Sequence, residues 1–96
     1  MKPSESLKLH REAVLRLAGS IGATNVRIFG SVLSGEDAEE SDVDILVDVP
    51  RGTTLLDMVR LQDALEAKLG TSVDVVTAGD LPASFRDHIL RTAKPL

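Results

Sequence analysis

Apolar side chains recur at helical spacing in the first quarter of the chain. An amphipathic helix places apolar residues three or four positions apart along one stripe. From about Ser6 to Ile21 this stripe consists of Leu7, Leu9, Val14, Leu17, Ala18 and Ile21. Glycines at positions 19 and 22 mark the weakening C-terminal end. The pattern therefore predicts one helix over about 6–21, and the polar residues 1–5 are expected to be frayed.

Short β-branched runs follow, and they predict strands separated by turn residues. Asn25–Phe29 indicates a first strand, which Gly30 ends. Residues 31–34 fit a short helical turn, and the polar, acidic stretch 35–41 fits a loop. Residues 42–49 then predict a second strand, closed by a Pro-Arg-Gly turn.

The rest of the chain predicts a helix, a strand and a last helix. Thr54 and Asp57 have the spacing of a capping box, and the helix that they open is expected to run to about Leu69. Its apolar face is expected to consist of Leu55, Met58, Leu61, Leu65 and Leu69. Residues 71–77 predict a third strand, and residues 82–92 predict the last helix.

This order of elements predicts the fold class α/β (α+β), as a single domain over residues 1–96. The expected architecture is a small mixed β-sheet with helices packed on one face. A helix between the second and third strands is a crossover connection, which makes these two strands parallel if they are neighbours.

Composition limits the classes of protein that fit. The 96 residues are 43% hydrophobic, and Phe29 and Phe85 are the only aromatic residues, so the core must be aliphatic. A net charge of −4 without a basic stripe argues against direct binding of nucleic acid. The absence of cysteine excludes disulfides and cysteine-based zinc sites. There is no membrane-length apolar run and no signal-peptide pattern, so we expect a cytoplasmic protein.

Aspartates lie inside two of the predicted strands, where this residue type is unfavourable. Because strand side chains alternate, Asp42 and Asp44 point the same way, with Cα atoms roughly 6–7 Å apart. Asp74 is flanked by valines and faces the same side if these valines face the core. Three unpaired carboxylates would repel one another, and their oxygen atoms favour Mg²⁺ or Mn²⁺ over zinc. An isolated Asp-x-Asp pair is often only an exposed strand face, which is how we interpret Asp48 near the strand end.

The Gly30-Ser31 turn, which ends the first predicted strand, is a second candidate binding site. Glycine permits a ligand to approach the backbone closely, and a following helical turn presents free N–H groups to an anion. The Ser31 hydroxyl adds a donor for a phosphate oxygen. Gly-Ser alone is a common turn, so its meaning depends on the ten residues that separate it from Asp42.

Gly30-Ser31, ten intervening residues and Asp42-Val43-Asp44 together resemble the signature of the DNA polymerase β-like nucleotidyltransferase superfamily. The chain is similar to its smallest branch, the minimal nucleotidyltransferases (MNT), from about residue 26 to residue 96. The runs Val26–Phe29 and Val73–Val76 agree with this resemblance. It implies a nucleotidyltransferase fold over nearly the whole chain.

The resemblance also implies an activity and a partner. Similar proteins bind ATP with two Mg²⁺ ions and transfer a nucleoside monophosphate with release of pyrophosphate. Asp42 and Asp44 would hold the metal ions, with Asp74 as the third carboxylate, which helps to activate the attacking hydroxyl. Gly30 and Ser31 would bind the triphosphate. Small relatives form hetero-oligomers with a HEPN-domain ribonuclease toxin, which they neutralise by AMP transfer onto a tyrosine or by complex formation.

One position departs from the family pattern. Many relatives carry arginine where this chain has Ser34, and the missing cation bears on turnover more than on the fold. Arg27, Arg51 or a partner residue are the candidates to replace it. Two alternatives remain open: a domain that neutralises the toxin by binding alone, and a nucleotidyltransferase subunit that modifies a small molecule.

The other polar groups are expected to lie at the surface. His10 and His88 have no second histidine at ligand spacing. The face of the last helix with Arg86, His88 and Arg91, and the acidic residues between 36 and 40, are interpreted as solvated.

Overall fold

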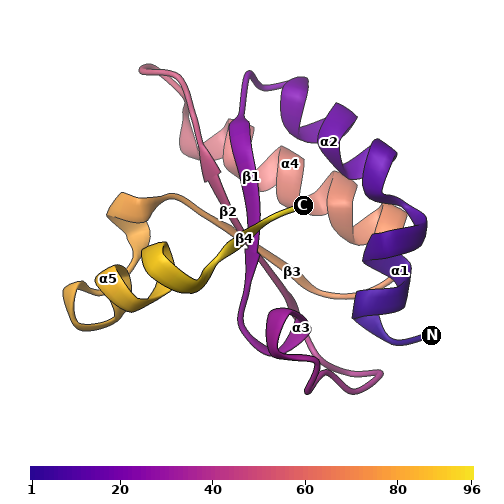
Figure 1. The fold of residues 1–96 in the computed structure, drawn as a ribbon. Coiled ribbons are helices and arrows are strands. Elements are labelled where there is room, and N and C mark those ends of the chain that lie inside the picture. The colour runs from indigo at the N-terminus through magenta and orange to yellow at the C-terminus, as the bar shows by residue number, and fades with distance from the viewer.

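Four strands form one mixed sheet in the order β3–β2–β1–β4 in the computed structural model, which describes all residues from Met1 to Leu96 (Figure 1). The strands are β1 (Thr24–Phe29), β2 (Val43–Asp48), β3 (Val73–Val76) and β4 (Lys94–Pro95). β1 is antiparallel to both β2 and β4, whereas β2 and β3 are parallel. The predicted mixed sheet and its parallel pair are confirmed.

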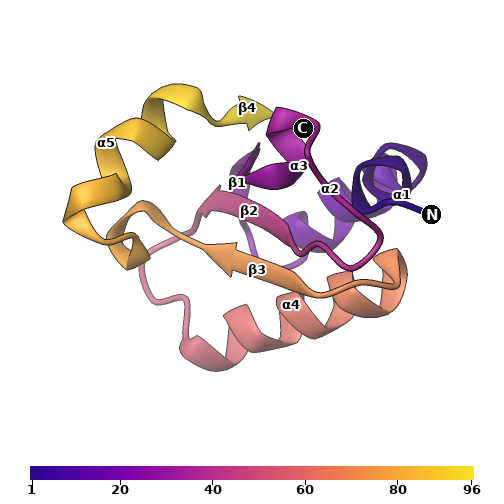
Figure 2. The ribbon, with the colours of Figure 1, turned by 90° about the horizontal axis from the view of Figure 1, so that it is seen from below.

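Helices α1 (Pro3–Leu9), α2 (Arg11–Gly19) and α4 (Leu55–Leu69) cover one face of this sheet (Figure 2). α2 and α4 pack against each other, and α4 also packs on β3. The short α3 (Ser31–Ser34) follows β1. After a 3₁₀ turn, η1 (Ala78–Asp80), α5 (Ala83–Thr92) connects the β3 edge to the β4 edge and lies away from α4. None of the helices has the length and apolar character needed to cross a membrane.

The single helix predicted over residues 6–21 is two helices that meet at His10. The His10 backbone, with φ −105° and ψ 19°, leaves helical geometry. The expectation that residues 1–5 are frayed is also wrong, because α1 begins at Pro3, which is buried. The Ser4 N–H donates to the Asp37 carboxylate at 2.9 Å, and the Ser6 hydroxyl donates to the Leu69 carbonyl at 2.8 Å. Contacts distant in sequence therefore order the N-terminus.

Aliphatic side chains fill the space between the sheet and helices α1, α2 and α4. The strand contribution is Val26, Ile28, Val43, Ile45, Val47, Val73 and Val75, and the helix contribution is Leu7, Val14, Ala18, Leu61, Leu65 and Leu69. Alternate positions of β2 and β3 point into this core, as the two-residue period of a strand requires. The side chains at the intervening positions point to the opposite face of the sheet.

Helix α4 begins and packs largely as predicted. The Asp57 N–H donates to Thr54 Oγ1 at 3.1 Å, and the Thr54 N–H donates to the Asp57 carboxylate at 2.9 Å, which completes the capping box. These hydrogen bonds hold the pKa of Asp57 below its ordinary value. Leu55, predicted in the core, is instead 80% exposed. A 15-residue helix is about 22 Å long and a four-residue strand about 13 Å, so the first turn of α4 extends past β3.

The C-terminal residues add a strand that the sequence pattern does not predict. Residues Lys94–Pro95 pair with β1, and the Leu96 N–H donates to the Val26 carbonyl at 3.0 Å. Arg11 of α2 donates to the Leu96 carbonyl at 2.8 Å. The end of the chain is therefore fastened to the sheet edge.

Truncation of Leu65 tests this assignment of the core, because its side chain is only 1% exposed. Leu65→Ala is expected to lower the free energy of unfolding by about 2–4 kcal/mol through lost burial and a cavity. Leu55→Ala, on the same helix but exposed, should change it by less than about 0.5 kcal/mol. Urea unfolding followed by circular dichroism gives both values, and equal effects would contradict the assignment.

Candidate functional site

The β2–β3 register brings two of the predicted site residues face to face. Asp44 of β2 pairs with Asp74 of β3. Their strand neighbours on either side are buried in the core, so both carboxylates point to the opposite face of the sheet. Asp42 immediately precedes β2, which begins at Val43 rather than at Asp42 as predicted. Asp44 is half-buried, while Asp42 and Asp74 are exposed. The predicted shared side is confirmed for Asp44 and Asp74, and Asp42 lies close enough for its charge to act on Asp44.

Asp42, Asp44 and Asp74 accept no hydrogen bond and form no ion pair. Burial, and then the neighbouring charges of Asp74 and Asp42, raise the pKa of Asp44 above its ordinary value. The other aspartate of the same strand face, Asp48, instead binds Arg27 at 2.8 Å and accepts from Asn25. Among the aspartates of this strand face, the negative charge of Asp48 is therefore compensated, and that of the three-aspartate cluster is not.

Gly30 joins the turn to this cluster. Its backbone has φ 78° and ψ −153°, a region that essentially only glycine occupies. A Cβ atom at position 30 would overlap the Asp44 carboxylate and come within 3.2 Å of its Cγ. The first N–H groups of α3, beginning at Ser31, have no partner within the helix. A phosphate bound at this turn would therefore lie beside Asp44.

The acidic loop before Asp42 is only partly solvated. Asp37, predicted at the surface, is buried, and the hydrogen bond from the Ser4 N–H lowers its pKa. Within the same loop the Ala38 N–H donates to Ser41 Oγ at 2.8 Å, and the Thr71 hydroxyl donates to the Ser41 carbonyl at 3.1 Å. These contacts hold the residue next to Asp42.

The cluster fits a divalent cation that has further ligands. No group of three acidic or imidazole side chains in the chain converges as a ready-made metal site. Mg²⁺ is typically bound by one or two carboxylates together with substrate phosphates rather than by a protein cage. The unpaired oxygens of Asp42 and Asp44, next to a turn suited to phosphate, meet that description.

The arginines considered as replacements for the one missing at Ser34 are occupied or distant. The Arg27 guanidinium pairs with Asp48 and also donates to the Asn25 carbonyl. Arg51 lies beyond the C-terminal end of β2, whereas Asp42 and Asp44 lie at its start. Ser34 itself is exposed and its hydroxyl donates to the Ser31 carbonyl at 3.1 Å. A partner residue is the remaining candidate.

Three further surface expectations have mixed outcomes. Arg86, interpreted as solvated, is partly buried and donates to the carbonyls of Ala78 and Leu81 at 2.9 Å, so it fastens α5 to η1. His10 is half-buried. His88 is exposed, as expected, but it lines a cavity with Gly30 and Ser34 that sequence reasoning missed.

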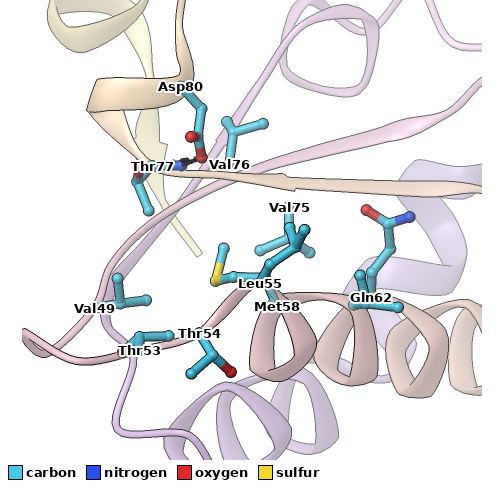
Figure 3. A pocket seen from close by; sticks show the side chains of 11 residues that line it. Val49, Thr53, Thr54, Leu55, Met58, Gln62, Val75, Val76, Thr77 and Asp80 are labelled. Atoms are coloured by element: carbon cyan, nitrogen blue, oxygen red, sulfur yellow. Dashed lines mark hydrogen bonds between the residues drawn. The ribbon is translucent and has the colours of Figure 1, made fainter.

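The largest groove, of about 530 Å³, lies elsewhere. It is formed by the start of α4, the end of β3 and η1 (Figure 3). Asp80 is its only acidic residue, and its carboxylate caps η1 by accepting from the Thr77 N–H at 2.9 Å. This groove includes none of Asp42, Asp44 or Asp74, so its size does not make it the catalytic site.

Comparison with known proteins agrees with the geometry. Residues 7–94 match the family described as nucleotidyltransferase domain. Protein adenylyltransferase MntA of Thermococcus cleftensis is 41% identical over 70 residues, which cover 73% of this chain and 71% of that protein. A solved structure of a candidate minimal nucleotidyltransferase is 49% identical, with a TM-score of 0.86 and coverage of 97% and 95%. A toxin–antitoxin crystal structure with AMP-PNP, 20% identical, shares the fold with a TM-score of 0.75, covering 88% of this chain and 69% of that one.

Substitution of Gly30 tests the contact between the turn and Asp44. Gly30→Ala should lower the free energy of unfolding by more than the roughly 1–2 kcal/mol of backbone strain, since Asp44 must also move. Gly35→Ala is the control: Gly35 also has a positive φ, of 77°, but a Cβ there meets no atom within 4 Å. If both variants lose the same stability in urea, Gly30 does not contact Asp44.

Neutralisation of Asp44 should stabilise the metal-free protein. Its raised pKa means that the folded state binds the proton more tightly, so stability falls as pH rises from the ordinary value of 3.8 through the folded value. Asp44→Asn removes this penalty and should raise the melting temperature at pH 7 in EDTA by a few degrees, a gain that disappears towards pH 3. The control is Asp63→Asn on the exposed side of α4, and a lower melting temperature for Asp44→Asn at pH 7 would refute the repulsion.

Proposed function

Because this chain belongs to the nucleotidyltransferase domain family, we propose that it is an antitoxin that transfers AMP from ATP to a HEPN-domain ribonuclease toxin. The observation that carries this proposal is the cluster of three unpaired carboxylates beside the Gly30-Ser31 turn. The name of the Thermococcus cleftensis relative, a protein adenylyltransferase, supports protein as the acceptor class. The shared fold with a toxin–antitoxin protein crystallised with AMP-PNP agrees with a toxin partner and an adenine nucleotide.

Each site residue has a distinct task in this reaction. Gly30 and Ser31 bind the triphosphate through backbone N–H groups and the Ser31 hydroxyl. Asp42 and Asp44 would hold two Mg²⁺ ions, which neutralise phosphate charge and stabilise the attacking and leaving oxygens. Asp74, opposite Asp44, accepts the proton of the acceptor hydroxyl, a toxin tyrosine. The hydroxyl oxygen of the tyrosine forms a bond to the α-phosphorus of ATP. At the same time the bond between the α-phosphorus and the oxygen that bridges to the β-phosphate breaks, and pyrophosphate leaves.

The acceptor side of the site comes from the partner. Residues 1–96 form one sheet and one core, so the proposal places the protein substrate on the exposed face of that sheet. The carboxylate face is the face of the sheet away from α4, and Asp42 and Asp74 are exposed on it. A toxin seated there, in a cytoplasmic hetero-oligomer, would bring its tyrosine to Asp74.

A second function, neutralisation by binding alone, is favoured by one observation. No lysine or arginine lies within ion-pair distance of the three carboxylates, and Ser34 stands where many relatives have arginine. Without that cation, the transition state for transfer would be less stabilised while docking to the toxin is unaffected. The two functions differ in whether the carboxylates are needed.

The decisive experiment measures transfer of α-labelled AMP to a co-purified HEPN partner. Asp42→Ala/Asp44→Ala should reduce transfer at least about 100-fold, because metal stabilisation of the transition state is lost. Asp63→Ala/Asp87→Ala removes two exposed, unpaired aspartates elsewhere and should leave the rate unchanged. Equal rates of AMP transfer by the two double variants would refute the enzymatic proposal. Neutralisation of the toxin without transfer, by wild type and both variants, would establish the binding function instead.

A further inference from the structure

A second cavity, of about 400 Å³, lies between the end of β1, α3 and α5. Its walls include Phe29, Gly30 and Ser34 on one side and Phe85, His88 and Ile89 on the other. Phe29 and Phe85 are the only aromatic residues of the chain, so all of its aromatic surface lines this one cavity. Phe85 is 59% exposed, and nothing in the fold requires an exposed ring at this place.

The cavity adjoins the carboxylate cluster at Gly30. Phe29 pairs in register with Asp44, and because Val26 and Ile28 point into the core, Phe29 points to the carboxylate face. Gly30, whose backbone abuts the Asp44 carboxylate, lines the cavity as well. A nucleotide bound at Asp42, Asp44 and the Gly30 turn would therefore lie beside this cavity.

The chemistry of the walls suits an uncharged aromatic ring rather than phosphate. No aspartate, glutamate, lysine or arginine lines the cavity. The Ser34 and Thr92 hydroxyls already donate to the carbonyls of Ser31 and His88. The His88 side chain makes no hydrogen bond and is the one polar side chain of the cavity with a donor that is not already used. An apolar slot of several hundred Å³ with few polar groups is typical of small-molecule sites.

We propose that this cavity binds the purine base of the nucleotide substrate, stacked on Phe85, with His88 at the polar edge of the base. The inference rests on the proposed nucleotidyl transfer and extends it by assigning a specificity site. Stacking of a base on an aromatic side chain contributes about 1–3 kcal/mol and depends on ring area, so purine triphosphates should bind more tightly than pyrimidine triphosphates. Recognition by one histidine predicts weaker discrimination between ATP and GTP.

The absence of tryptophan and tyrosine from the chain permits a direct optical test. Phe85→Trp introduces a single fluorophore, and Mg·ATP should quench it saturably by stacking. Leu90→Trp is the matched control, since Leu90 is exposed on the same helix but outside the cavity, and its emission should not change. Mg·tripolyphosphate, which has phosphates but no base, should leave the emission of Phe85→Trp unchanged.

Calorimetry of Phe85→Ala gives a second, independent measurement. Its dissociation constant for Mg·ATP should rise roughly tenfold, while that for Mg·tripolyphosphate stays at the wild-type value, which also shows that the variant is folded. Wild-type affinity of Phe85→Ala for ATP, or a Phe85→Trp signal that ATP does not change, overturns the base site while leaving nucleotidyl transfer intact. Failure of the wild-type protein to bind either ligand overturns the proposed function together with this inference.

Discussion

The alternation of side chains along β2 is the constraint on which both the fold and the candidate site depend. Val43, Ile45 and Val47 are fully buried under the helices, so the side chain of Asp44 points to the opposite face of the sheet. The parallel register with β3 then sets Asp74 directly beside it. A parallel pair needs a crossover, which α4 supplies while covering the same core. Burial of aliphatic side chains on one face of the sheet therefore holds the carboxylates of Asp44 and Asp74 together on the other face, although their charges repel.

The same register extends from the carboxylates to the turn. Because β1 is antiparallel to β2, the last residue of β1, Phe29, lies opposite Asp44, and Gly30 follows immediately. Only glycine fits there, since the backbone has a positive φ and any Cβ would meet the carboxylate. The ten residues between the turn and Asp42 are held in place, because Asp37 ties their loop to the first turn of α1. The spacing between Gly30-Ser31 and Asp42 therefore corresponds to the length of the connection from β1 to β2.

Features set by local chemistry could be predicted from the sequence. Two-residue alternation around Asp44 and Asp74 gave their shared face, and the Thr54–Asp57 spacing gave the start of α4. Features set by contacts distant in sequence could not. The break at His10 depends on how α1 meets α4 and the acidic loop, and the pairing of Lys94 with β1 involves a segment too short to show a period. The Phe29–Phe85 cavity belongs to this second group, since it forms only when α5 returns across the sheet.

The negative charge of the carboxylate cluster limits which ligands the site can bind. The carboxylate cluster and a triphosphate are both anionic, and the arginines that could have met them serve other purposes: Arg27 binds Asp48, and Arg86 binds backbone carbonyls. In the isolated chain, burial and then repulsion by Asp74 and Asp42 raise the pKa of Asp44. In the proposed reaction, positive charge would therefore arrive with the ligands, as divalent cations, or from a partner surface. If the proposed ligands bind at this site, the carboxylate cluster gives up some folded-state stability for binding, the exchange expected where function and stability compete.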